Sequence, residues 1–306
     1  MENRRIKNIK LSPFVYKVKG CKNYAFYDLL KGKLHRVNSE MGELKKLIND
    51  LLKAEIVIET EGVIPFKFSL NMSHYKEKTK LRELQIRVTG ACDENCSICG
   101  DQPCCCYKGE KEMDEKIVST VIEQTKDISI SHILITGGNP FKNKEKLLSI
   151  RNGIIADQYS VLFKGLIETD DQSFLEMNGI HLKTRGYSEL EINESNMILD
   201  FFSFFYNHYF NPCWGNKLGI DVDGTIRPCL WSQETPGNIL EKDIRDLILD
   251  GEFDKYWELK KDDIKICKEC EYRYACSDCR VEAVRQGGLF DSKTAGCKYD
   301  PVEGVW

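Results

Sequence analysis

The sequence has no long apolar run, no secretion signal at its start and no internal repeat. Among its 306 residues, no apolar stretch approaches the ~20 residues that a membrane helix needs. The opening residues 1–7 are polar and charged, with no apolar stretch behind them, which does not fit a signal peptide. No motif recurs at a fixed period, as it would in a repeat protein. We therefore expect a cytoplasmic protein with no membrane partner.

Charge is nearly balanced but unevenly distributed. The chain carries 44 Lys and Arg against 48 Asp and Glu, a net charge of −4. Residues 1–83 hold 18 of the basic and 10 of the acidic side chains, a net of +8, so the remainder carries −12. A basic N-terminal third indicates either an ordinary solvated surface or an anionic partner. Its lysines form no stripe interleaved with aromatic residues, so we do not expect nucleic acid.

The 14 cysteines are the feature to explain. One stands at 21, six lie between 92 and 106, and seven between 213 and 297. A reducing cytosol argues against disulfides, so clustered cysteines indicate metal ligands or catalytic groups. Cys21, standing alone, is expected to be a small core residue. The run Cys104-Cys105-Cys106 has two interpretations. Its thiols are inert and partly buried, or one of them is an extra ligand or a redox-active thiol.

Periodicity divides the chain into three predicted domains and an α/β fold class. Residues 1–78 predict a small α+β domain, with short strands over 13–38, a helix over 40–52 and a strand at 56–58. Residues 72–83 are polar and basic and indicate a linker. Residues 79–206 alternate strands with helices, which is typical of parallel α/β units. The strands are expected at 84–88, 132–135, 161–163, 180–182 and 197–199, and the helices at 113–126 and 143–155. Residues 207–306 are loop-rich, and we expect bound metal to stabilise them.

Three cysteines directly follow the first strand of the middle domain. Their spacing is Cys92-x3-Cys96-x2-Cys99. Three thiolates on one loop leave a fourth coordination position open. A structural zinc ion would want a fourth ligand, whereas an iron–sulfur cube can leave one iron free to bind a cofactor. The loop after a strand of a β/α barrel is also where such folds place their chemistry.

With apolar Ile98 before its last cysteine, this motif resembles the signature of radical S-adenosylmethionine enzymes. The resemblance implies that Cys92, Cys96 and Cys99 are catalytic and hold a 4Fe–4S cluster. The open iron of that cluster would bind S-adenosyl-L-methionine. One electron would then cleave this cofactor to a deoxyadenosyl radical, which abstracts a hydrogen atom from the substrate.

A second motif follows the next predicted strand. The segment Gly137-Gly138-Asn139-Pro140 resembles the Gly-Gly-Glu-Pro motif of the same family, which contacts the methionine amino group. The resemblance implies cofactor binding by Gly137, Gly138 and Asn139. Asn139 replaces the family's Glu and lacks the charge that favours an ammonium group. The alternative reading is an ordinary turn at the end of a strand.

The C-terminal cysteines have a more specific spacing. Cys213 is followed after ten residues by Gly224 and after four more by Cys229. The sequence Cys267-x2-Cys270-x5-Cys276-x2-Cys279 comes later, and then Cys297. A pair of zinc knuckles is one interpretation. The arrangement also resembles the SPASM domain, which carries auxiliary clusters in peptide-modifying radical S-adenosylmethionine enzymes. The resemblance implies one auxiliary 4Fe–4S cluster on Cys267, Cys270, Cys276 and Cys297. It implies a second on Cys213, Cys229 and Cys279, whose fourth ligand stays open.

The resemblance also implies a fold and a function. Between Leu84 and Cys213 there is room for about four β/α units of roughly 31 residues, whereas the family usually has six, so we expect a shortened, partial barrel. The substrate would be a ribosomally made precursor peptide, whose modification could be a cross-link, a thioether or an epimerisation. Residues 1–78 would bind its leader by strand addition, and their charge suits an acidic leader. A flavodoxin or ferredoxin would supply electrons, and an ATP-grasp ligase is a possible companion.

Two alternatives stay open at this stage. A degenerate relative would keep the clusters without cleaving the cofactor, and would act as a peptide-binding or electron-transfer partner. A structural zinc protein would use the cysteines as knuckles.

Overall fold

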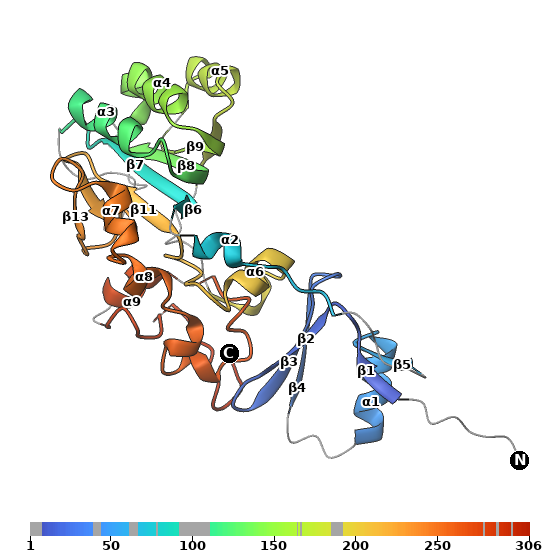
Figure 1. Cartoon of the computed structure of the whole chain (residues 1–306). Helices are drawn as coiled ribbons and strands as arrows, with labels where there is room; N and C mark the ends of the chain where they lie inside the picture. The colour runs from blue at the N-terminus through green and yellow to red at the C-terminus, as the bar shows by residue number, and fades with distance from the viewer. Residues whose placement is uncertain are drawn as a thin grey trace, which may run out of the picture. The chain divides into compact units, whose positions relative to one another are not determined.

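A computed structural model places the chain in two compact units (Figure 1). It describes residues 8–38, 44–60, 67–77, 79–91, 111–163, 165, 167–184, 192–277, 279–285, 288–294 and 296–306. Unit 1 comprises residues 1–72, 191–212 and 260–306, and unit 2 comprises residues 73–190 and 213–259. The three domains expected from the sequence stay a prediction, because compactness alone does not test them.

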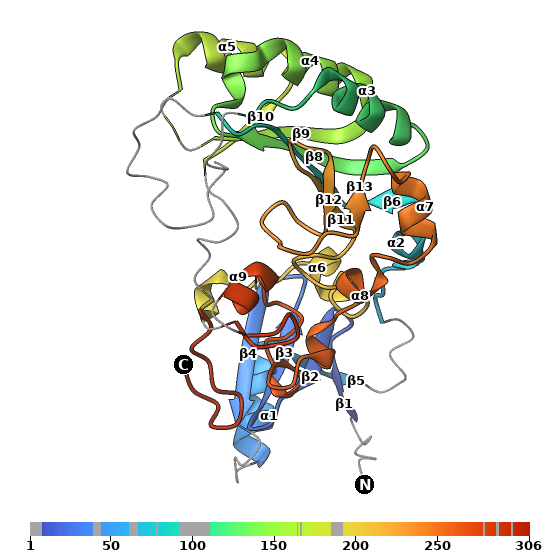
Figure 2. The ribbon, with the colours of Figure 1, turned by 90° about the vertical axis from the view of Figure 1, so that its left-hand side faces the viewer.

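Unit 2 is built on four parallel strands in the order β10-β9-β8-β7. Three helices follow β7, β8 and β9 in turn and cover one face of the sheet (Figure 2). The elements are β7 (Glu83–Thr89), α3 (Glu115–Gln124), β8 (Ser129–Gly137), α4 (Lys144–Gly153), β9 (Ala156–Leu162), α5 (Thr169–Met177) and β10 (His181–Lys183). The predicted α/β class is thereby confirmed, and the described residues show three strand–helix units followed by a fourth strand, where about four units were expected.

The sheet continues on the other side of β7. Strand β11 (Lys217–Ile220) pairs in parallel with β7, and β12 (Thr225–Arg227) and β13 (Gly237–Asn238) add in antiparallel fashion. In the described part of the chain, β10 and β13 are the two ends of this path, so the sheet stays open as a partial barrel. Unit 2 also contains α2 (Ser73–Lys76), β6 (Lys80–Leu81), α7 (Ile244–Leu249) and α8 (Asp254–Trp257).

Unit 1 contains two small antiparallel sheets. Strands β2 (Val15–Lys19), β3 (Asn23–Asp28) and β4 (Lys33–Asn38) form a three-stranded meander, as predicted. Strand β1 (Asn8–Leu11) pairs with β5 (Val57–Thr60), and α1 (Leu44–Lys53) lies between β4 and β5 in the sequence. Later segments of the chain add α6 (Phe201–Tyr206) and α9 (Arg280–Arg285).

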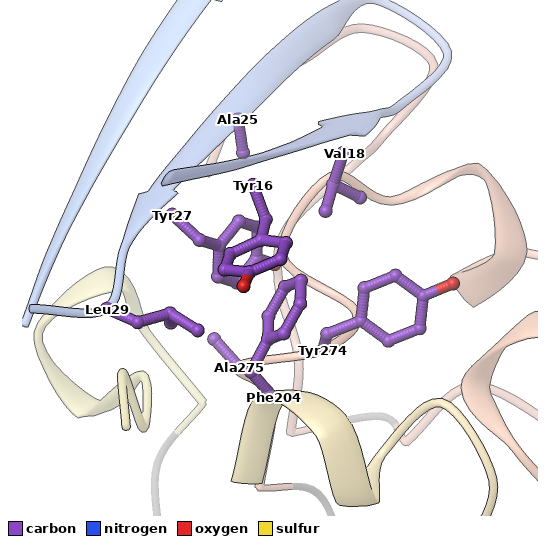
Figure 3. Close-up of a cluster of buried hydrophobic side chains, with 8 residues drawn as sticks. All are labelled: Tyr16, Val18, Ala25, Tyr27, Leu29, Phe204, Tyr274 and Ala275. Atoms are coloured by element: carbon purple, nitrogen blue, oxygen red, sulfur yellow. The ribbon is translucent and has the colours of Figure 1, made fainter. Parts of the chain in front are cut away.

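An aromatic core joins the distant segments of unit 1 (Figure 3). Side chains of β2 and β3 meet helix α6 and the turn just before Cys276. The buried members are Tyr16, Val18, Ala25, Tyr27, Leu29, Phe204, Tyr274 and Ala275. The Phe204 ring lies 4.8 Å from that of Tyr16 and 5.7 Å from that of Tyr274, close enough for favourable aromatic packing. The N-terminal strands therefore help to position a cysteine almost 250 residues further along the chain.

Some sequence-based expectations were wrong. Residues 197–199 form no strand. Met197 and Leu199 are apolar because they pack against the aromatic core, and Ile198 donates one backbone hydrogen bond to Ala275. The expected linker contains α2 and β6, and α5 was not predicted. Cys21 is exposed on a hairpin turn and is not a core residue.

In the described residues, no helix is both long and apolar enough to span a bilayer.

Candidate iron–sulfur sites

The first three predicted ligands, Cys92, Cys96 and Cys99, lie outside the described residues, as do Cys104–Cys106. The structure does describe the chain on both sides of them. Gly90 donates its backbone N–H to the Lys111 carbonyl at 2.7 Å, and Met113 donates to Val88 at 2.9 Å. Gly90 and Lys111, on either side of the cysteine motif in the sequence, therefore lie close together at the end of β7.

The Gly137–Asn139 motif lies against the same point. Gly138 N–H donates to the Thr89 carbonyl at 2.9 Å, and Asn139 N–H donates to the Ala91 carbonyl at 2.7 Å. A Cβ atom on Gly137 would come within 2.6 Å of the Thr89 carbonyl oxygen, so only glycine fits here. The glycine motif thus lies beside residues 89–91, which lead into the cysteine motif, because β7 and β8 are neighbouring parallel strands that end at the same edge.

The Asn139 side chain has a local structural role. Its Oδ1 accepts the Phe141 N–H at 3.1 Å and caps the short 3-10 helix over Pro140–Asn143. The amide is therefore a helix cap of the kind that Asn commonly provides. The backbone of Asn139 is engaged as well, since its N–H donates to Ala91 and its carbonyl accepts from Lys142 N–H.

Strand β7 carries polar side chains at every second position. Leu84, Ile86 and Val88 alternate with Glu83, Gln85 and Arg87, and all are buried. Arg87 Nη1 lies 2.9 Å from both carboxylate oxygens of Asp221, which begins the turn leading to Cys229. This buried ion pair fixes the Cys229 region of unit 2 to the strand that leads into Cys92.

A second buried network surrounds Glu83. Its carboxylate accepts from His132 Nδ1 at 3.0 Å and lies 3.3 Å from Lys217 Nζ. Because an ionised carboxylate can only accept, His132 Nδ1 is the donor in this contact, and His132 Nε2 lies 3.0 Å from Ser160 Oγ. The network links β7, β8, β9 and β11 across the face that the three helices leave uncovered.

Cys213 and Cys229 are both buried in unit 2. The pKa of the Cys229 thiol is raised to about 12, mainly by burial; Lys217 opposes this rise and the nearby Cys213 adds to it. Two such close thiols become good ligands once a metal displaces their protons. Cys279 belongs to unit 1, so the predicted grouping of all three cysteines stays a prediction.

The other four predicted ligands come together in unit 1. Cys267, Cys270, Cys276 and Cys297 line one pocket with about 440 Å³ of empty space, part of it open to solvent. Cys267 begins a 3-10 helix over Cys267–Glu269, and the backbone of Cys297 forms an isolated parallel β-bridge with Ile192. The sequence predicted this foursome from its resemblance to a SPASM domain, and the structure places all four around one space.

Burial makes these thiols costly to ionise without a metal. It raises the pKa of Cys270 well above its usual range, and the neighbouring Cys276 and Cys267 add to the rise. It also raises the pKa of Cys276, with Cys267 and Cys297 again contributing. Neighbouring thiols contribute to each of these shifts, and a bound metal cluster would take up the charge of the thiolates.

Two kinds of metal group bind sites made of four thiols. A zinc ion draws its sulfur ligands to about 2.3 Å from one centre. In a 4Fe–4S cube each thiolate binds a different iron, so the sulfur atoms stay further apart. In the part of the chain that the structure describes, no three His, Cys, Asp or Glu side chains converge on a single metal-ion position.

Two buried cations stand beside these thiols. Lys261 is 1% exposed and its Nζ lies 3.9 Å from Cys267 Sγ. Arg280 is fully buried, and its guanidinium donates to the carbonyl oxygens of Phe290 and Ser292 and to Thr294 Oγ1. Both cations oppose the rise in the pKa of Cys276. The pocket is therefore electrostatically suited to a negatively charged occupant.

The loop that carries the cysteines rests on the β2–β3 hairpin. Cys21 N–H donates to the Glu269 carbonyl at 2.8 Å, and Arg273 donates to the Lys19 carbonyl at 2.9 Å. A Cβ on Gly20 would come within 2.9 Å of the Glu271 backbone nitrogen, so the hairpin turn needs glycine. The position of the cysteine loop thus depends on the N-terminal strands.

Aromatic side chains form another wall of the pocket. The rings of Tyr272, Tyr299 and Trp306 lie 5.0 to 5.6 Å apart. The Tyr272 hydroxyl donates to Glu194, and the Tyr299 hydroxyl donates to Glu271. An apolar wall of this kind limits the access of water and lowers the local dielectric, which affects the redox potential of a metal site.

The sequence did not predict the cations. Lysine and arginine are usually solvated, so neither Lys261 nor Arg280 stands out among 44 basic residues. One signal was present: Lys261 lies six residues before Cys267 and Arg280 directly follows Cys279.

Comparison with known domains supports the iron–sulfur assignment. Residues 82–176 match the model of a 4Fe–4S single cluster domain. That range contains Cys92, Cys96 and Cys99 together with Gly137–Asn139. The predicted resemblance to an iron–sulfur domain is thereby confirmed over these residues. No curated protein matches the chain.

Several solved structures are similar in part. SuiB of Streptococcus suis bound to its precursor peptide SuiA is 14% identical, with a TM-score of 0.44, covering 95% of this chain and 100% of that one. BtrN in complex with AdoMet and 2-DOIA is 18% identical, with a TM-score of 0.41, covering 65% and 94%. Native anSMEcpe with bound AdoMet and Cp18Cys peptide is 11% identical, with a TM-score of 0.43, covering 72% and 94%. TM-scores below 0.5 do not by themselves establish a shared fold.

Proposed function

We propose that this chain is a radical S-adenosylmethionine enzyme that modifies a ribosomally made precursor peptide. The match of residues 82–176 to a 4Fe–4S single cluster domain carries the proposal, because it covers the cysteine motif and the glycine motif together. Cys92, Cys96 and Cys99 would hold the cluster, which on binding S-adenosyl-L-methionine supplies a deoxyadenosyl radical. Gly137, Gly138 and Asn139 would contact the cofactor.

The C-terminal pocket supports auxiliary cluster binding. Four thiols from a spacing typical of SPASM domains surround one space and are flanked by Lys261 and Arg280. In this proposal Cys267, Cys270, Cys276 and Cys297 bind one 4Fe–4S cluster. Cys213, Cys229 and Cys279 bind another, which gives three clusters in the chain.

A peptide substrate is supported by the small sheet of unit 1. In the described residues β4 pairs only with β3, which leaves its other edge available for an added strand. Lys33 and Arg36 lie on β4 and would favour an acidic leader peptide. A flavodoxin or ferredoxin would supply the electron, and an ATP-grasp ligase would be a companion enzyme in the cytoplasm.

The test is anaerobic incubation of the reconstituted chain with S-adenosylmethionine and dithionite. We expect about twelve irons per chain for three cubes and release of deoxyadenosine. The matched control is the Cys96→Ala variant. It should keep the irons of the auxiliary clusters and release no deoxyadenosine. Intact clusters without deoxyadenosine would favour a degenerate, peptide-binding relative. Colourless protein with stoichiometric zinc would reject the proposal.

A further inference from the structure

The feature that carries a further inference is the buried lysine beside the four-cysteine pocket of unit 1. Lys261 is almost completely excluded from water, and its Nζ is within 3.9 Å of Cys267 Sγ. An ammonium group in such a place costs free energy unless negative charge lies close to it. The thiolates of a bound cluster would supply that charge.

The charge of Lys261 acts on the pocket as a whole. Lys261 lines the same pocket as the four cysteines, and its Nζ lies beside Cys267 Sγ, so its field acts on the occupant of that pocket. Burial in a low-dielectric site strengthens such an effect, whereas an exposed lysine is screened by water and salt. Lys268, which directly follows Cys267, is exposed and provides that contrast within the same loop.

Reduction adds one negative charge to a cluster. A fixed cation close to the sulfur atoms stabilises the reduced state more than the oxidised one, so it raises the reduction potential. Hydrogen bonds to the sulfur atoms act in the same direction, and net charge and hydrogen bonding are the means by which proteins set cluster potentials. Arg280 adds a second buried cation on the Cys276 side.

We propose that Lys261 raises the reduction potential of a cluster on Cys267, Cys270, Cys276 and Cys297 above the value that this cluster would have without the buried charge. This inference rests on the proposed function, which assigns a 4Fe–4S cluster to these four cysteines.

The experiment is a dithionite titration of the reconstituted full-length chain, followed by electron paramagnetic resonance. In the wild-type chain, the signal of the cluster at Cys92–Cys99 is identified by its loss in Cys96→Ala. Lys261→Met should lower the reduction potential of the auxiliary cluster by at least about 59 mV. For one electron, this shift corresponds to a tenfold change in the ratio of reduced to oxidised cluster. Lys261→Arg should keep the wild-type value.

Lys268→Met is the matched control, since it removes the same charge from an exposed position, and it should leave the potential unchanged. If Lys261→Met fails to assemble the cluster, Lys261→Gln carries the same expectation. An unchanged potential in the uncharged variant, or a shift of equal size in Lys268→Met, would overturn the inference. A chain that binds no iron would instead overturn the proposed function.

Discussion

The buried ion pair between Arg87 and Asp221 gives the sharpest test of how unit 2 is held together. The two side chains are only 5% and 7% exposed. Removing one partner of a buried pair leaves an uncompensated charge, at a cost of about 3–5 kcal/mol. Arg227 Nε lies 3.3 Å from Asp221 and would still neutralise it in part. We therefore expect Arg87→Met to lower the free energy of unfolding by about 3 kcal/mol, near the bottom of that range.

The assay is urea unfolding of the holoprotein under anaerobic conditions. Replacing both partners, as in Arg87→Met with Asp221→Leu, should recover part of the loss, because no buried charge is then left alone. The matched control is Lys126→Met, which breaks the exposed Lys126–Glu123 pair and should change stability by less than about 1 kcal/mol. A loss of under about 1 kcal/mol in Arg87→Met would refute the reasoning, since it would mean that water reaches the pair.

Three further outcomes are expected. Gly137→Ala should destabilise the chain by about 1–3 kcal/mol, because its Cβ would meet the backbone of Thr89. It should also weaken the binding of S-adenosylmethionine measured by calorimetry. Wild-type affinity in this variant would contradict a role of the glycine motif in cofactor binding. Cys276→Ala should lower the iron content of the reconstituted protein by about four irons, with circular dichroism as the folding control; an unchanged iron count would remove this cysteine from the ligand set. Burial lowers the pKa of His208 below its usual value, so the unfolded chain binds this proton more readily than the folded chain. Stability should therefore fall as the pH drops through about 6.5. Urea unfolding at several pH values should show a flatter pH profile of stability in His208→Phe, and a profile identical to wild type would contradict this.

Regular patterns in the sequence were sufficient for much of the fold. The parallel strands of unit 2 are nearly continuous apolar or alternating runs, and their order follows from consecutive strand–helix units. The grouping of Cys267, Cys270, Cys276 and Cys297 came from the resemblance to a SPASM domain, because Cys-x2-Cys spacing alone would pair Cys276 with Cys279. Residues 197–199 were misassigned because an apolar run is compatible with any buried segment, and only its tertiary partners decide its conformation.

Other features depend on contacts between distant segments, which no local pattern encodes. Lysine is usually found on the surface, and Lys261 lines a pocket only because of contacts made on folding. The pairing of β11 with β7 joins residues 217–220 to residues 83–86, and nothing in either segment specifies the other. Likewise, the role of Asn139 as a helix cap depends on the turn that follows it, whereas the sequence suggested only a departure from a family motif.

The shared aromatic core of unit 1 has a consequence for synthesis of the protein on the ribosome. The Tyr27 hydroxyl bonds Glu271 across 244 residues, and Asn23 bonds Tyr299 across 276. Strands β2 and β3 therefore emerge long before their partners exist, and such non-local contacts form slowly. The proposed cluster at the C-terminal pocket could form only once the chain is complete. A fragment cut after residue 78 would lack Phe204, Tyr274 and Ala275, three of the eight buried members of this core.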